Sequence, residues 1–281
     1  MPKGLVFGNG FLGSRIAAEL GYQLIGREEV NPLNFNDLGV FLDSKRPDVA
    51  INAVGKTGGP GEIGVDWCET HREESFRSNV SAAINISSAC SDREIYFVHF
   101  GSGCIYEGDN GGRGFKEEDE PNFYGPQFYA KTKILAEKAL LELPGLILRI
   151  RMPIDDRPSP RNLITKLSNY PKVITAPNSA TTIPHMVPAL RTMIEKRMAG
   201  VYNFVNPGTI SASEIMYLYQ EIVDPQHSFQ PMDLAELDSI TKARRSNCYL
   251  NTNKLFSQGI VLPQIHDAVV DCLSIYRRNR K

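Results

Sequence analysis

A glycine-rich turn between an apolar run and a helical pattern constrains the fold of this chain most strongly. The apolar run Gly4–Phe7 is followed by Gly8, Asn9, Gly10, Phe11, Leu12 and Gly13. Helical spacing then begins, over Ser14–Leu20. In such a unit the first glycine allows a tight turn, the second admits a pyrophosphate and the third lets the helix pack on the strand. This context predicts a dinucleotide site, whereas a bare glycine turn has a purely structural interpretation.

Further apolar runs alternate with helical stretches along the first half of the chain. They cover Gln23–Gly26, Val49–Ala53, Ile95–Phe100 and Leu146–Ile150. Strands that are buried on both faces and alternate with helices predict an α/β fold, a Rossmann-type doubly wound parallel sheet. Prolines then break the chain into short pieces, although 211–223 still has helical spacing. We therefore expect a dinucleotide-binding domain over 1–151 and mainly a smaller C-terminal substrate-binding lobe over 152–281, with some segments returning to the sheet.

Charge and cysteine usage exclude several kinds of partner. The 31 Lys and Arg residues nearly balance 32 Asp and Glu residues, so nucleic acid is not expected as a partner. The five cysteines are odd in number and form no CxxC pair, so we expect no disulfide framework and no metal site. No apolar run reaches the ~18 residues that span a bilayer, and residues 1–10 show no basic n-region or cleavage site, so we expect an unprocessed chain. These features predict a soluble, cytoplasmic protein that does not bind membranes.

The residue after the second predicted strand bears on the choice of cofactor. Sites that prefer NAD usually place an acidic residue there to hold the ribose 2′-hydroxyl, but this chain has Arg27. A guanidinium favours a 2′-phosphate and hence NADPH. Glu28 and Glu29 follow directly, so NADH remains an alternative, and Arg27 can also be read as an ordinary surface charge.

A YxxxK pattern supplies candidate acid chemistry. Tyr129 and Lys133 are four residues apart at the start of a stretch that becomes helical over 134–141, so they share one helix face. An ammonium beside a phenol can lower the phenol's pKa from about 10 and help it pass a proton to a carbonyl oxygen. The pattern alone is common in helices and gains weight only from its surroundings.

With Ser102 at a strand end and the segment Asn52-Ala53-Val54-Gly55 at another, the chain resembles an extended short-chain dehydrogenase/reductase. The resemblance implies that Ser102, Tyr129 and Lys133 form the catalytic triad beside a nicotinamide. It also implies that Asn79 is a supporting amide, that Ala53, Val54 and Gly55 line the cofactor, and that the protein is a homodimer.

Seven segments narrow the resemblance: TGGPGEIGVDWCETHREESFRSNV, GSGCIYEG, GRGFKEEDEPNFYG, FYAKTK, RIRMPI, PRNLITKLSNY and NFVNPG. They are similar to the bifunctional 3,5-epimerase/4-reductases that complete nucleotide-rhamnose synthesis in plants and large viruses. The expected reaction converts UDP-4-keto-6-deoxy-D-glucose to UDP-L-rhamnose, with a dTDP-sugar as the other candidate. Two alternatives stay open: a reductase that acts only on an already epimerised ketone, and a non-catalytic regulatory subunit on the same frame.

Cys104 follows the predicted catalytic serine by two positions. Inversion beside a ketone needs one group to remove a proton and another to return it on the opposite face. If the strand stays extended, Ser102 and Cys104 face the same way and both contact the substrate, which makes the thiol a credible acid/base. GDP-fucose synthase, a relative with both chemistries, has a cysteine at the same offset. The alternative is a small core residue.

The resemblance also proposes residues for the rest of the substrate site. Lys166 is the second acid/base, and Asn162, one turn earlier on the same helix face, binds substrate. Arg245, in a stretch that flanks the nucleotide diphosphate in family members, is a candidate for bidentate contact with it. His185 is a competitor to Lys166 for the acid/base role.

Overall fold

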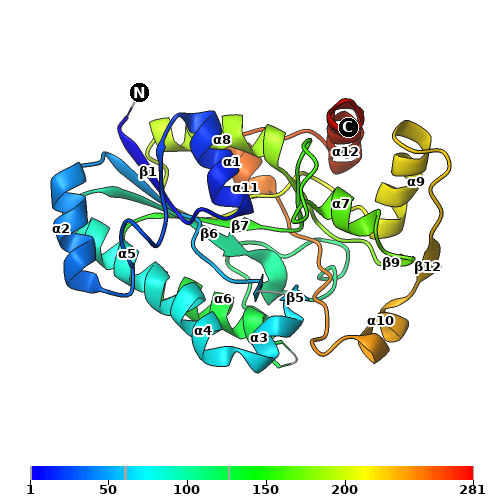
Figure 1. The fold of residues 1–281 in the computed structure, drawn as a ribbon, viewed down its shortest axis with the longest axis horizontal. Coiled ribbons are helices and arrows are strands. Elements are labelled where there is room, and N and C mark those ends of the chain that lie inside the picture. The colour runs from blue at the N-terminus through cyan, green and yellow to red at the C-terminus, as the bar shows by residue number, and fades with distance from the viewer. Residues whose placement is uncertain (1, 60–61, 126, 281) are drawn as a thin grey trace.

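The computed structural model describes residues 2–59, 62–125 and 127–280; residues 60 and 61, in the first of the seven segments, lie outside this description. Six parallel strands form the central sheet (Figure 1). In spatial order they are β11 (Gly200–Asn203), β7 (Leu146–Ile150), β6 (Tyr96–Ser102), β3 (Val49–Asn52), β1 (Gly4–Phe7) and β2 (Gln23–Ile25). The predicted doubly wound parallel sheet is confirmed.

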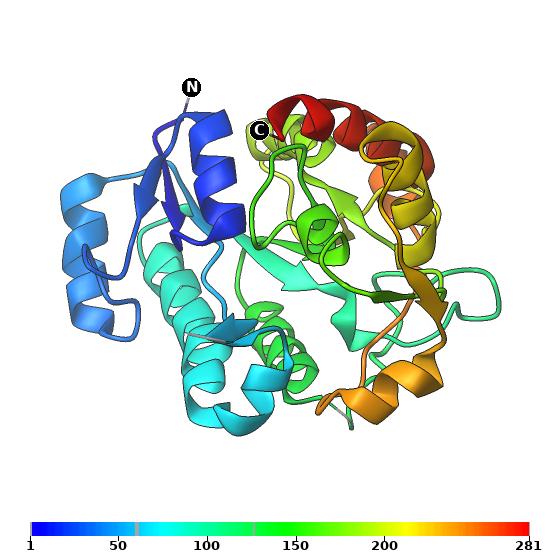
Figure 2. The same cartoon turned by 45° about the vertical axis from the view of Figure 1, so that its right-hand side comes forward.

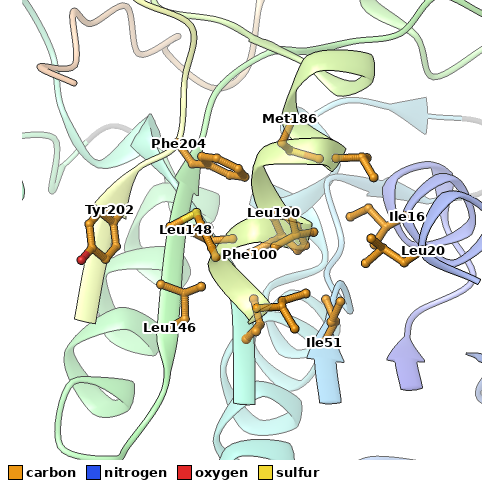
Figure 3. Packing of buried hydrophobic residues seen from close by; sticks show 14 of the residues in the cluster. Ile16, Leu20, Ile51, Phe100, Leu146, Leu148, Met186, Leu190, Tyr202 and Phe204 are labelled. Carbon is orange, nitrogen blue, oxygen red and sulfur yellow. The ribbon is translucent and has the colours of Figure 1, made fainter. Parts of the chain in front are cut away.

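Helices cover both faces of this sheet (Figure 1). One face carries α1 (Phe11–Leu20), α8 (Ile183–Glu195) and α11 (Asn253–Ser257), and the other carries α2 (Phe35–Lys45), α5 (Ala82–Ser91) and α6 (Phe128–Leu140). In Figure 3, Ile16 of α1 and Leu190 of α8 pack over Ile51 and Leu148 of the sheet, and all four side chains are fully buried. Burial on both faces is why the strands read as unbroken apolar runs.

The direction in which successive strands are added to the sheet changes at β1. Strand β2 pairs with one side of β1 and β3 pairs with the other. At the carboxyl ends, Ala53 donates a backbone hydrogen bond of 2.9 Å to Phe7. The glycine turn and the segment after β3 therefore lie side by side at a topological switch point, where open α/β sheets bind their ligands.

The lobe has its own core. Strand β8 (Pro153–Ile154) pairs with β10 (Thr181–Thr182), and β9 (Lys172–Ile174) pairs with β12 (Gln230–Met232). Apolar side chains join α7 (Leu163–Leu167), α9 (Ala212–Ile222) and α12 (Ile265–Asn279). Figure 2 shows α12 beside α9, with α10 (Leu234–Ile240) at the far end of the lobe. Helix α9 begins at a capping box between Ser211 and Glu214, and its predicted span is confirmed to within one residue at each end.

Strand β11 and helix α8 follow residue 151 but belong to the central layers. Helix α8 runs through Pro184 and Pro188, so the expectation that prolines break this region into short pieces was wrong there. Pro184 lies in the first turn, where a backbone N–H has no acceptor within the helix, and Pro188 removes only one further hydrogen bond.

Short elements complete the chain between the sheet strands. They are β4 (Gly58–Gly59), β5 (Glu62–Ile63), α3 (Asp66–Thr70), α4 (Arg72–Phe76), the π-helical turn η1 (Arg77–Ser81) and the 3-10 turn η2 (Gly103–Ile105). Within the described ranges, every helix is too short or too polar to cross a bilayer.

Candidate active site

The glycine turn forms a cradle with space at one position only. A Cβ at Gly8 would lie 2.8 Å from the Ala53 carbonyl, and one at Gly13 would lie 1.9 Å from the Gly8 oxygen. A Cβ at Gly10 would meet nothing within 4 Å. Gly8 and Gly13 are therefore fixed by close packing, whereas Gly10 faces open space, as a site for a pyrophosphate requires.

The N-terminus of α1 is free to receive an anion. Its N-cap is Gly10, no side chain caps it, and its first turn holds no acidic residue. The helix begins at Phe11, three residues before the predicted start. Phe11 and Leu12 pack against the core cluster, and the carbonyl of Asn9 accepts a hydrogen bond from Ser14. The turn residues thus hold the helix end in place, and its N–H groups point outward.

Arg27 lies just beyond β2 with its side chain exposed. Of the two acids that follow, Glu29 turns back onto the strand, where its Oε1 accepts a hydrogen bond of 3.1 Å from the Gly26 backbone. Its Oε2 accepts one of 3.3 Å from the Gln23 amide. Glu29 is therefore committed to the strand end, and Arg27 and Glu28 are the exposed charged side chains beside it. Contact of Arg27 with the 2′ group of a dinucleotide stays a prediction.

Asn52 and His99 form a buried pair that the sequence analysis did not single out. The pair lies beside the segment after β3, which faces the glycine turn. Asn52, at the end of β3, accepts a hydrogen bond of 2.9 Å from Val54 N, and its amide nitrogen lies 3.0 Å from His99 Nδ1. Burial lowers the pKa of His99 well below its ordinary value, so the ring is neutral and its Nδ1 can accept from Asn52. An asparagine that ends a fully apolar strand is the sequence signal that would have revealed this pair.

Asn79 supports the same wall from η1. Its Oδ1 accepts a hydrogen bond of 2.6 Å from Lys56 N, and its Nδ2 donates to the Lys56 carbonyl and to Thr132 Oγ1, each at 3.1 Å. Gly55 lies against this amide. These contacts join the segment after β3 to the helix that carries Lys133. Direct contact of Asn79 with a cofactor stays a prediction.

Ser102, Tyr129 and Lys133 meet at the carboxyl end of β6. Helix α6 begins at Phe128, whose backbone N donates a hydrogen bond of 2.6 Å to Glu69 Oε1. The Ser102 hydroxyl lies close enough to the Tyr129 phenol to act against the rise in that phenol's pKa. Lys133 is buried, and its ammonium donates a hydrogen bond of 2.9 Å to the carbonyl of Phe100.

The electrostatics of the phenol differ from the prediction. Burial raises the pKa of Tyr129 and the nearby Cys104 adds to this rise, whereas Ser102 and the charge of Arg151 act to lower it. Burial also lowers the pKa of Lys133 to about 8. The predicted lowering of the phenol pKa by Lys133 is therefore not found, because the phenol is desolvated and the ammonium is hydrogen-bonded to Phe100.

Cys104 reaches this cluster by a different backbone path from the one predicted. Strand β6 ends at Ser102, and the chain turns at once into η2, so the expectation of an extended Ser102–Cys104 segment was wrong. The turn is closed by a hydrogen bond of 3.1 Å from Cys104 N to Ser102 Oγ. The half-buried thiol lies 2.8 Å from Arg151 Nη1. Arg151 was missed as a site residue, although an arginine directly after an apolar strand was visible in RIRMPI.

Lys166 lies on α7, and Asn162 is the N-cap residue of this helix. The two side chains have different surroundings. In the described chain, the half-buried Lys166 ammonium has no hydrogen bond or ion pair, and burial together with Arg161 lowers its pKa. Asn162 caps the helix: it accepts from Asp155 N and Ile164 N and donates to the carbonyls of Asp155 and Arg157. The substrate-binding role predicted for Asn162 is corrected, because its buried amide is fully used within the lobe.

Two further predicted residues have partners elsewhere. Arg245 makes a bidentate ion pair with Asp66, with two N–O distances of 2.8 Å, and its contact with a nucleotide diphosphate stays a prediction. The pair docks the lobe on α3. His185 lies between Thr182, at 3.0 Å, and Asp271 of α12, at 3.5 Å. In the described part of the chain, no three His, Cys, Asp or Glu residues are grouped so that they could hold a metal ion.

The family model for the RmlD substrate binding domain matches residues 4–278. The chain belongs to this family. It is 37% identical over 247 residues to a bifunctional dTDP-4-dehydrorhamnose 3,5-epimerase/dTDP-4-dehydrorhamnose reductase of Arabidopsis thaliana, which covers 85% of this chain and 80% of that protein. It is 38% identical over 236 residues to a trifunctional plant UDP-glucose 4,6-dehydratase/epimerase/reductase, of which it spans only 35%.

Solved structures of family members superpose closely. The L780 UDP-rhamnose synthase of Acanthamoeba polyphaga mimivirus is 31% identical, with a TM-score of 0.91 over 98% of this chain and 99% of that one. A dTDP-4-dehydrorhamnose reductase from Clostridium acetobutylicum has a TM-score of 0.83 over 97% of this chain and 99% of that one at 18% identity, which shows the shared fold alone.

Proposed function

We propose that this RmlD-family chain is an NADPH-dependent nucleotide-sugar 4-keto reductase that also inverts C3 and C5, converting UDP-4-keto-6-deoxy-D-glucose to UDP-L-rhamnose. The observation that carries the proposal is the cluster at the end of β6, where the Cys104 backbone donates a hydrogen bond to Ser102 Oγ and the Tyr129 phenol lies nearby. Relatives named as rhamnose synthases and as epimerase/reductases support both halves of the reaction.

The residues present fit NADPH. The space at Gly10, the uncapped N-terminus of α1 and the exposed Arg27 would hold its pyrophosphate and 2′-phosphate. A dTDP-4-dehydrorhamnose reductase of this fold from Bacillus anthracis was solved in complex with NADP. NADPH, when bound, supplies the hydride, and NADH remains a second option because Glu28 adjoins Arg27.

Tyr129 acts as the proton donor in the reduction. Because burial raises its pKa, the phenol is protonated at neutral pH and can give its proton to the C4 oxygen as that carbon is reduced. Ser102 positions the same oxygen. The Lys133 ammonium, held by the Phe100 carbonyl, contributes positive charge near the phenolate that forms.

Cys104 and Lys166 act in the inversions. The Cys104 thiolate takes the proton from a carbon beside the ketone, so the C–H bond breaks, an S–H bond forms and the electron pair moves into an enolate whose oxygen Ser102 and Tyr129 hold. The Lys166 ammonium returns a proton to the opposite face. We place the substrate between α7 and the carboxyl end of β6, where it would reach both Lys166 and Cys104.

UDP is the nucleotide we assign to the substrate, and dTDP is the alternative. The L780 protein, which aligns with 98% of this chain, is named a UDP-rhamnose synthase, whereas the bifunctional plant relative is named for dTDP-sugars. We also assign a homodimer. Leu135 on α6 and Phe76 on α4 are exposed apolar residues on the helical face that would pair.

The test is incubation with UDP-4-keto-6-deoxy-D-glucose and NADPH, followed by identification of the sugar by NMR. UDP-L-rhamnose supports the whole proposal. A reduced sugar with C3 and C5 unchanged would show a reductase only, and absence of NADPH oxidation with both the UDP and the dTDP ketone would overturn the reductase assignment. A parallel incubation in D₂O without cofactor measures deuterium at C3 and C5, and so tests the inversions separately.

A further inference from the structure

Arg151 is a buried cation without a carboxylate. The residue follows β7 directly, and its side chain is only 3% exposed. Its Nη1 donates to Cys104 Sγ at 2.8 Å and to Ser246 Oγ at 3.2 Å. Its Nη2 donates to Asn178 Oδ1 at 2.5 Å and to the Ser246 carbonyl at 2.9 Å. Every partner except the thiol is a neutral group in the described chain.

Arg149, two residues earlier, shows the usual arrangement. It is equally buried, and it forms a bidentate pair with Glu137 at 3.0 and 2.7 Å. A guanidinium out of water is strongly disfavoured unless an anion compensates it, and arginine does not lose its proton in proteins. Arg151 lacks such a carboxylate among its hydrogen-bond partners, so an anion supplied by the described chain would have to come from another chemical class.

Three groups near Arg151 can carry a negative charge, and two are disfavoured. They are Cys104, Cys248 and Tyr129. Burial raises the pKa of Cys248 to about 11 and also raises that of Tyr129. Cys248 Sγ instead donates to the Gly103 carbonyl at 3.3 Å. Cys104 is the group in direct contact with the guanidinium.

We propose that Arg151 is a positioning residue that pairs its charge with the Cys104 sulfur and aims that sulfur at the substrate. The guanidinium is fixed from its far side by Asn178 and Ser246, so the sulfur is held in one place against η2. When the thiolate takes a proton from the sugar, Arg151 loses its counter-charge, which favours release of that proton. The catalytic meaning of this pairing rests on the proposed function, but the pairing itself does not.

The charged and titratable surroundings of the sulfur are few. Tyr129 and Lys133 face it from α6, Cys248 faces it from the lobe and Arg151 faces it from the end of β7. Lys133 has its own acceptor in Phe100, and burial lowers its pKa to about 8, so its charge is lost as pH rises through that value. Arg151 keeps its charge across the whole range.

The test is the pH profile of alkylation of Cys104 by iodoacetamide, in which the thiolate forms an S–C bond and iodide leaves. Mass spectrometry of the peptide that contains Cys104 separates it from the other four cysteines. We expect Arg151→Gln, which keeps polar contacts but removes the charge, to lower the rate at pH 7 about tenfold or more and to move the midpoint to higher pH. Arg151→Lys should keep the midpoint near that of the wild type.

Arg149→Lys is the matched control, since it alters a buried guanidinium on the same strand and should leave the profile unchanged. An unaltered profile in folded Arg151→Gln, verified by NADPH binding, overturns the inference. If that variant does not fold, the wild-type profile decides: a Cys104 midpoint no lower than the value of about 8.5 for free cysteine overturns the charge pairing. Because alkylation needs no substrate, a Cys104→Ala variant that still exchanges C3 and C5 protons would refute the proposed inversion without touching this result.

Discussion

Lys133 donates its hydrogen bond to the carbonyl oxygen of Phe100 at 2.9 Å, which fastens α6, the helix that also carries Tyr129, to β6. The ammonium lies inside the protein at 6% exposure. Burial is the main cause that lowers its pKa from 10.5 to about 8, while Glu137 and Cys104 act in the opposite direction. The catalytic lysine is thus held in a place where its charge is disfavoured.

This placement predicts a pH-dependent stability in the protein without cofactor. Between pH 8 and 10.5 the unfolded chain keeps the Lys133 proton that the folded chain loses, so this residue's contribution to the free energy of unfolding rises with pH. Relative to Lys133→Met, the wild type should gain on the order of 1 kcal/mol or more between pH 7.5 and 9.5. Urea denaturation of both proteins at the two values measures it. A constant difference between them would contradict the lowered pKa.

Tyr129→Phe should separate the two proposed reactions. Without the phenol no proton reaches the C4 oxygen, so NADPH oxidation should fall by about 10² or more. Deuterium exchange at C3 and C5 should continue, because Cys104 and Ser102 are unchanged. The loss of NADPH absorbance measures reduction, and NMR of the recovered sugar measures deuterium exchange. Tyr217→Phe, at an exposed position on α9, is the matched control and should alter neither; full reduction by Tyr129→Phe would remove the phenol from the mechanism.

The parts of the fold that were predictable are those set by local pattern. The apolar runs located β1 and β7 because buried parallel strands are apolar on both faces, and the glycine turn located α1. Helix α8 was not predicted because the many prolines in this region were read as helix breaks. A proline in the first turns of a helix removes few hydrogen bonds, so its position decides whether it ends the helix.

Site residues that depend on distant partners were not predictable in the same way. Arg245 pairs with Asp66, 179 residues away, and no local pattern reveals such a contact. Asn162 became a helix cap because the chain around Asp155 folds back on it. The Arg151–Cys104 contact likewise joins two strand ends 47 residues apart, and it exists only because β6 and β7 are neighbours in the sheet.

Arg27 should govern the choice between the two nicotinamide cofactors. Arg27→Ala removes a charge-assisted contact to the 2′-phosphate, so the KM for NADPH should rise about tenfold or more, while that for NADH should change little. Initial rates with both cofactors at fixed ketone concentration measure the ratio. Lys138→Ala, which removes another exposed cation at a distance from the cradle, should leave the ratio unchanged. An equal change for both cofactors would assign Arg27 to the surface instead.

Lys166→Met should stop proton return at the ring carbon that this lysine serves. Burial and Arg161 both lower the pKa of Lys166, so the free amine needed after each proton transfer is more accessible than in a solvated lysine. Exchange in D₂O should fall by about 10² or more, whereas reduction of an already epimerised ketone should persist. Lys172→Met, on β9 and paired with Glu236, is the matched control. If Lys166→Met exchanges deuterium at the wild-type rate, Lys166 is not the second acid/base. His185, whose imidazole contacts Thr182 and Asp271, is then the next candidate, and His185→Gln is the variant to measure.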